Sequence, residues 1–143
     1  MRIMGLDYGD SRIGVALSDE FGWTAAPFEV VEYKRGHRKA HRRITEIIEE
    51  KDVTTVVVGY PLNMNGTAGF RVEATEQFCE DLGRRNPGIE IVKWDERLTT
   101  AAADRAMREM GVKQEVKGFN DKLAAAFILQ GYLDHLRNME NHQ

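Results

Sequence analysis

The sequence predicts an α/β protein in which helices cover both faces of one mixed five-stranded sheet. Three short β-like runs follow one another within residues 1–33, and the short links between them predict an antiparallel meander. The later strands alternate with helices, an order that favours parallel strands joined by right-handed crossovers. Residues 54–60, TTVVVGY, form a continuous β-branched run, which is typical of a strand covered on both faces. The expected order is therefore β-β-β-α-β-α-β-α-α.

The first half of the chain contains the meander and one helix. Its three strands are MRIMGLDYG (1–9), RIGVALSD (12–19) and FEVVEY (28–33). The first two are joined by a short glycine turn. A helix over residues 37–52 is predicted by isoleucines at helical spacing, Ile44, Ile47 and Ile48.

In the second half, helices and strands alternate after a loop at residues 61–69. A helix over residues 70–85 is expected to turn five side chains inward: Val72, Thr75, Phe78, Cys79 and Leu82. The run IEIVKWDE (89–96) is the fifth strand, and we expect its Trp94 to lie in the core rather than to stack on a base.

Two helices are predicted at the carboxyl-terminal end. Thr99 or Thr100 caps the first, which runs to about Met110 and is stopped by Gly111. Asn120 or Asp121 starts the second. The middle of this last helix is apolar nearly all round, so we expect it to be buried.

The length and composition are those of a single globular domain over residues 1–143, with residues 138–143 expected to fray. No apolar run reaches the length of a membrane-spanning helix, and the first residues do not form a signal peptide. Cys79 is the one cysteine, so no internal disulfide can form, and we expect a small buried thiol. A reducing cytoplasm fits this usage.

Charge is distributed unevenly along the chain. The net charge of −3 argues against a general nucleic-acid coat protein, which would be strongly basic. Residues 34–43, KRGHRKAHRR, nevertheless hold six Lys or Arg and two His. This segment is either a solvated helix start or a contact for a phosphate backbone. Basic residues at a helix amino terminus oppose the helix dipole, which slightly favours a role other than stability.

Three carboxylates are expected to meet at one edge of the sheet. Asp7 lies late in the first strand, Glu96 ends the fifth, and Asp121 opens the last helix. Ligands of open sheets collect at the carboxyl ends of parallel strands. Three carboxylates in one place repel unless a cation holds them, and their hard oxygens suit Mg²⁺ or Mn²⁺. Taken singly, each has a simpler interpretation, a turn residue for Asp7 and a helix cap for Asp121.

Four motifs resemble those of the YqgF family, also called RuvX: GLDYGDSRIGVALSD, VVVGYPLNMNGTAG, DERLTT and DKLAAAFILQGYL. They stand in the family's order and span about residues 1–137. The resemblance implies a ribonuclease H-like fold and a cytoplasmic nuclease. Family members are described as nucleases that mature the 5′ end of precursor 16S ribosomal RNA, or as Holliday-junction resolvases. It also implies that Asp7, Glu96 and Asp121 are the catalytic residues and the ligands of Mg²⁺ or Mn²⁺, in a site with room for two metal ions.

The same motifs suggest residues that contact substrate. The candidates are Gly9, Arg12, Asn63, Gly66, Arg71, Arg97, Lys113 and Lys117. Each also has a structural alternative, because glycines form tight turns and arginines form ion pairs. One departure concerns the fourth strand, where resolvases carry an acid and this chain has Gly59.

Three functions remain open at this point. The first is a metal-dependent nuclease acting on precursor ribosomal RNA or, second, on branched DNA; it would be a monomer or a homodimer. Another is an RNA-binding ribosome assembly factor without catalysis, which the acidic pI of about 5.8 and the missing acid at Gly59 favour. An ATPase of the actin or sugar-kinase type is disfavoured, because one copy of the fold is present where those enzymes use two.

Overall fold

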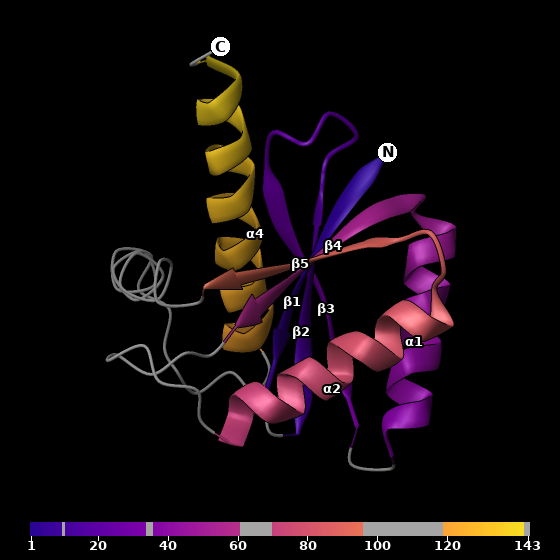
Figure 1. Ribbon diagram of the computed structural model, residues 1–143. Helices are drawn as coiled ribbons and strands as arrows, with labels where there is room; N and C mark the ends of the chain where they lie inside the picture. The colour runs from indigo at the N-terminus through magenta and orange to yellow at the C-terminus, as the bar shows by residue number, and fades with distance from the viewer. Residues whose placement is uncertain (10, 34–35, 61–69, 96–118, 142–143) are drawn as a thin grey trace.

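The computed structural model describes residues 1–9, 11–33, 36–60, 70–95 and 119–141. Within these residues, five strands form one sheet, and three helices pack on its two faces (Figure 1). The strands are β1 (Arg2–Tyr8), β2 (Arg12–Ser18), β3 (Ala25–Glu32), β4 (Val53–Tyr60) and β5 (Glu90–Asp95). The helices are α1 (His37–Glu50), α2 (Phe70–Arg85) and α4 (Phe119–Asn141).

The sheet has the mixed topology that the element order predicts. Its strand order is β3-β2-β1-β4-β5. The pairs β1–β2 and β2–β3 are antiparallel, whereas β1–β4 and β4–β5 are parallel. The carboxyl ends of β1, β4 and β5 therefore lie at the same edge, which we call the carboxyl edge of the sheet.

The third strand is longer than expected. It begins at Ala25 rather than at Phe28, and it contains Pro27. A proline is tolerated there because β3 is an edge strand, where one side of the backbone needs no donor. A register shift beside Ala16 accompanies the pairing. The run Ala-Ala-Pro has low β propensity, and it joins the strand through pairing with β2.

One face of the sheet is covered by α1 and α2. Met4, Leu6 and Tyr8 of β1 point into this layer. The residues predicted to turn inward are all buried: Ile44, Ile47 and Ile48 of α1, and Val72, Thr75, Phe78, Cys79 and Leu82 of α2. Val56, Val57 and Val58 of β4 are fully buried, as expected for a strand covered on both faces.

The other face of β1 lies under α4 at very short range. A Cβ placed on Gly5 would lie 2.7 Å from Cβ of Leu129 and 2.9 Å from the carbonyl oxygen of Ala125. A Cβ on Gly59 would lie 2.6 Å from Cδ1 of Ile128. Glycine at these two positions therefore lets the helix backbone approach the sheet. Most of the apolar middle of α4 is buried, as predicted, and Ala124 and Phe127 are half-buried.

The predicted helix over about residues 99–110 lies outside the described residues. The last helix begins at Phe119, one or two residues before the predicted start, and extends to Asn141. Fraying of residues 138–143 stays a prediction. Among the helices that the structure describes, none is long and apolar enough to cross a membrane.

His41 of α1 makes the stability of the fold depend on pH. Its ring is 2% exposed and stacks on Phe78, with ring centroids 4.9 Å apart. Neither ring nitrogen has a hydrogen-bond partner among the described residues. Burial, followed by the charge of Arg85, lowers the pKa of His41 below its usual value near 6.5.

We expect the free energy of unfolding to fall as pH drops below about 6.5, because the unfolded chain then binds a proton that folded His41 rejects. Urea unfolding at pH 7.5 and 5.5 measures this difference. The variant His41→Leu should flatten the profile, whereas the control His135→Gln should leave it unchanged. An equal pH dependence in His41→Leu would contradict the assignment.

Candidate functional site

Asp7 lies at the carboxyl edge, on the face of the sheet that α4 covers. Gly5 contacts α4, and successive strand residues alternate between faces, so Asp7 shares that face. Its neighbours Leu6 and Tyr8 point into the opposite layer. In the register of β1 and β2, Asp7 lies opposite Gly14. Gly14 therefore presents no side chain to this half-buried carboxylate from β2.

Helix α4 brings Asp121 to the same level of the sheet. Gln130 accepts a hydrogen bond from the backbone N–H of Ala25, 2.9 Å away, near the beginning of β1, and Ala125 lies over Gly5. The helix therefore runs antiparallel to β1, with its amino terminus at the carboxyl edge (Figure 1). Four helical residues separate Ala125 from Asp121, about 6 Å, and two strand residues separate Gly5 from Asp7, about 7 Å. The backbone of Asp121 thus reaches the level of Asp7.

The fifth strand ends at this edge as well. Asp95, its last residue, pairs in register with Tyr60 at the end of β4. Trp94 packs with Tyr132 of α4, so the next residue, Asp95, has its side chain on the opposite face. Glu96, the predicted ligand, follows Asp95 in the chain and lies outside the described residues. No metal-ligating group of three His, Cys, Asp or Glu occurs among the residues whose placement is described.

The glycine turn after β1 is tightly built. The N–H of Gly9 donates to the carbonyl oxygen of Arg12 at 2.9 Å, and a Cβ on Gly9 would lie 2.8 Å from that oxygen. The hydroxyl of Tyr33 donates to the carbonyl oxygen of Gly9. Gly9 is therefore required by the turn itself. The turn holds Arg12, the first residue of β2, close to the carboxyl edge.

Other predicted substrate contacts are only partly described. Arg71 lies in the first turn of α2, and only its backbone is described. Five further candidates lie outside the described residues: Asn63, Gly66, Arg97, Lys113 and Lys117. At Gly59, the position of the departure from the resolvases, the side chain of Ile128 occupies the space that a larger side chain would need. A carboxylate at position 59 would need Ile128 to move.

An aromatic cluster at the carboxyl edge was not foreseen from the sequence. Tyr8 stacks on Tyr33 and Phe78, with ring centroids 5.6 and 4.6 Å apart, and its hydroxyl lies 3.0 Å from Nε2 of His37. The cluster lies under α1 and α2, on the face opposite Asp7. It fixes the end of β1 and the start of α1 together. No spacing in the sequence signals these contacts, because they join β1, the residue after β3 and two helices.

The expectation that Trp94 has a structural role is confirmed, and Asp19 also has a structural role. Trp94 is half-buried between Tyr132 and His135, and its indole nitrogen has no hydrogen-bond partner in the described part of the chain. Asp19 is a turn residue, since Oδ1 accepts a 2.7 Å hydrogen bond from the N–H of Trp23. That bond lowers the pKa of Asp19.

Cys79 is buried in α2, and burial raises the pKa of its thiol to about 11. We expect no reaction of the folded protein with a disulfide reagent at pH 8, because the thiolate is the attacking species. Absorbance of the released thiol in the presence and absence of urea measures the reaction. Stoichiometric labelling of the folded protein, faster than its unfolding, would contradict this expectation.

Sequence comparison extends over nearly the whole chain. The family model "RuvX: Holliday junction resolvase" matches residues 1–135. A protein of Ruminiclostridium cellulolyticum named "Putative pre-16S rRNA nuclease" is 54% identical over 140 residues, which cover 95% of this chain and 96% of the relative. A protein of the same name from Acetivibrio thermocellus is 52% identical over 135 residues, 94% of this chain and 96% of that one.

Solved structures agree on the fold. Thermus thermophilus RuvC in complex with a Holliday-junction substrate superposes with a TM-score of 0.58 at 15% identity, covering 95% of this chain and 96% of that one. The fowlpox virus resolvase with its junction DNA gives a TM-score of 0.59 at 11% identity, covering 95% and 99%. Together with the sheet order, these likenesses confirm the expected ribonuclease H-like fold. On the extent of the family match and the identity to its curated relatives, the chain belongs to the RuvX family.

Proposed function

We propose that this protein is a cytoplasmic, metal-dependent nuclease that hydrolyses phosphodiester bonds in precursor 16S ribosomal RNA. The observation that carries the proposal is the arrival of Asp7 and the first turn of α4 at one level of the carboxyl edge. Relatives at 52–54% identity, named for action on precursor 16S RNA, support the choice of substrate.

Asp7, Glu96 and Asp121 are the proposed catalytic residues. Trp94 faces α4 and Asp95 does not, so alternation along a strand supports Glu96 as the next carboxylate on the α4 side. The three residues come from β1, from the sequence after β5, and from α4. Mutual repulsion of three carboxylates at one place favours a bound cation over an empty acidic site.

The donor set fits Mg²⁺ or Mn²⁺. All three proposed ligands offer carboxylate oxygens, which these hard cations prefer, and neither cysteine nor histidine belongs to the set. When bound, such a cation activates water and stabilises the leaving oxygen of a phosphodiester. The chain's own residues would orient the cation and exclude bulk water. Gly14 leaves room beside Asp7 for the scissile phosphate.

Substrate contacts would come from the turns and loops around this edge. The tight turn at Gly9 supports a role for Arg12, whose guanidinium is suited to a phosphate. We assign the same role to the remaining candidates, Asn63, Gly66, Arg71, Arg97, Lys113 and Lys117. These contacts are sequence-independent, so they would set affinity rather than choose a cleavage position.

Resolution of a four-way DNA junction is the second candidate. The description of the matching family model favours it. A junction has two symmetric strands to cut, so this activity would require a homodimer. A monomer suffices for cleavage of an RNA precursor.

Incubation of the wild-type protein with precursor 16S RNA and with a synthetic four-way junction, each with Mn²⁺ or Mg²⁺, separates the candidates. We expect RNA cleavage, with products mapped at the 5′ end of the mature sequence. Junction cleavage by a dimer would favour the second candidate. Tight RNA binding without cleavage under any divalent ion would contradict both and leave a non-catalytic assembly factor.

A further inference from the structure

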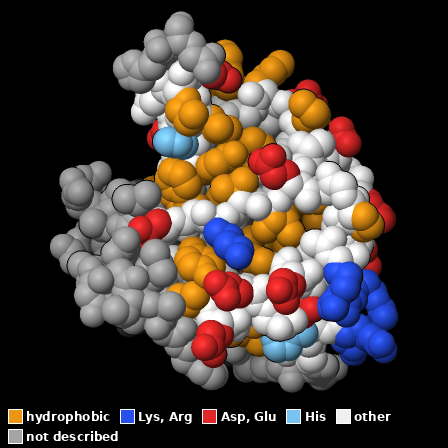
Figure 2. Space-filling model, viewed as in Figure 1, with side chains coloured by type: hydrophobic (Ala, Val, Ile, Leu, Met, Phe, Trp, Pro, Cys, Tyr) orange, Lys and Arg blue, Asp and Glu red, His pale blue; other side chains and the backbone are white. Residues whose placement is uncertain are grey.

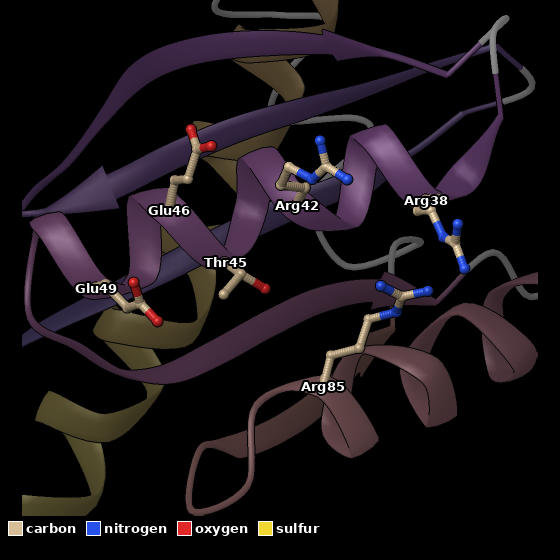
Figure 3. A pocket seen from close by; sticks show the side chains of 6 residues that line it. All are labelled: Arg38, Arg42, Thr45, Glu46, Glu49 and Arg85. Atoms are coloured by element: carbon tan, nitrogen blue, oxygen red, sulfur yellow. The ribbon is translucent and has the colours of Figure 1, made fainter.

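Three arginines on two helices gather at a surface depression on the side of the sheet opposite Asp7. Arg38 and Arg42 of α1 and Arg85 of α2, here called the arginine cluster, line a depression of about 500 Å³. Its other lining residues are Thr45, Glu46 and Glu49. The side chains of Arg38 and Arg85 reach toward one another from separate helices (Figure 3). A group of Lys and Arg side chains is visible at the lower right of Figure 2.

Acidic residues within the described part of the chain offset the charge of this cluster only in part. None of its three arginines forms an ion pair within the described residues: Glu29 and Glu46 pair with Arg43, and Asp81 pairs with Arg84. Nε and Nη2 of Arg43 lie 2.8 and 2.7 Å from the carboxylate oxygens of Glu29. Glu49 also lines the depression and forms no ion pair with the cluster. Two guanidinium groups that face one depression repel each other, so an anion between them would be stabilised.

The charges in the first turn of helix α1 are unfavourable for the helix. That turn has no acidic residue, and Gly36 at the cap makes no side-chain hydrogen bond. Arg38 and Lys39 stand there instead, against the positive end of the helix dipole. The positive charge therefore does not serve the stability of the helix. A bound polyanion would be attracted by the arginines and by the dipole together.

The cluster begins at the same edge of the sheet as Asp7. The hydroxyl of Tyr8, the residue after Asp7, lies 3.0 Å from Nε2 of His37, the residue before Arg38. The acidic residues Glu49 and Glu50 occupy the far end of α1. Positive charge is thus concentrated at the end of α1 nearest the acidic site, on the other face of the sheet. A chain of phosphates that crosses this edge would meet both.

We propose that the arginine cluster is a second contact site for the phosphate backbone of the RNA substrate, separate from the site of cleavage. This inference rests on the proposed function for the identity of the nucleic acid. Guanidinium groups bind phosphate through paired N–H donors, so the contact is strong without reading sequence. Its consequence is affinity that depends steeply on salt.

The test is fluorescence anisotropy of a labelled precursor 16S RNA fragment at several salt concentrations. All proteins carry Asp7→Asn, so that the RNA stays intact whether or not the wild type cuts it. The test variant is Arg38→Gln/Arg42→Gln/Arg85→Gln. A matched control removes the same charge at the opposite end of the sheet, Arg2→Gln/Lys51→Gln/Arg137→Gln. A third variant changes the cluster to Lys, which keeps its charge.

Loss of three phosphate contacts should lower the slope of log affinity against log salt concentration by about 2 for single-stranded RNA. When salt is reduced from 200 to 50 mM, the affinity of the parent protein should therefore rise about 20-fold more than that of the Gln variant. We expect this loss in the Gln variant, with the slope retained in the control and the Lys variant. An unchanged slope in the Gln variant, or an equal loss in the control, would overturn the proposal. The proposed function is tested independently of this binding experiment: it would be contradicted if the wild type cut neither nucleic acid.

Discussion

Replacing Asp7 by Asn is expected to lower the rate of RNA cleavage by roughly a thousandfold without unfolding the protein. A carboxylate that helps to hold a catalytic cation contributes several kcal/mol to stabilising the transition state, and this corresponds to a loss of that order. Asn has nearly the same shape as Asp, and Gly14 opposite it has no side chain to clash with, so the packing under α4 should not change. Single-turnover cleavage with Mn²⁺ in excess measures the effect.

Asp19→Asn is the matched control for this variant. It makes the same chemical change in a turn, where an amide oxygen can still accept the hydrogen bond from Trp23. We expect cleavage at the wild-type rate. If Asp7→Asn also cut normally, Asp7 would be a structural strand-end residue, and the acidic site would have to be sought elsewhere.

Replacing Gly5 by Ala is expected to destabilise the fold by about 1–3 kcal/mol and to reduce cleavage as well. The new Cβ would lie 2.9 Å from the carbonyl oxygen of Ala125 and 2.7 Å from Cβ of Leu129. Backbone atoms of α4 cannot rotate away, so the helix must shift as a body. Because Asp121 belongs to this helix, the shift would move it relative to Asp7. Urea unfolding and the cleavage rate report the two effects.

Gly59→Ala separates a shift of the helix from the mere addition of a methyl group. Its Cβ would meet Cδ1 of Ile128 at 2.6 Å, the far end of a flexible side chain that can adopt another rotamer. Both substitutions gain the same backbone entropy in a strand. We therefore expect Gly59→Ala to cost less than Gly5→Ala. Equal costs would show that contact with the backbone of α4 is not what constrains Gly5.

Local patterns in the sequence predicted most of the fold. The β-branched run of β4 and the isoleucines of α1 specify burial directly, because strand and helix periods determine which side chains share a face. The predicted start of β3 was wrong by three residues. Pairing with β2 extends the strand through Pro27, which has no local preference for a strand. The role of Gly5 was also missed, because the close approach of α4 joins residues more than a hundred positions apart.

The candidate site was predictable to a lesser extent. The placement of Asp7 follows from strand topology, because parallel strands bring their carboxyl ends to one edge. The arginine cluster was only half visible: the basic segment of α1 could be read from the sequence, whereas Arg85 joins it through helix packing. Tyr8, Tyr33 and Phe78 form their stack by the same kind of long-range contact.

The proposed function requires that Asp7, Glu96 and Asp121 form one cation site. Calorimetric titration of Mn²⁺ into the wild type, Asp7→Asn, Glu96→Gln, Asp121→Asn and the control Asp19→Asn tests it most directly. We expect each of the first three substitutions to weaken binding by about tenfold or more, since each removes a charged ligand, whereas the control should bind like the wild type. Wild-type affinity in all three site variants would contradict a shared metal site.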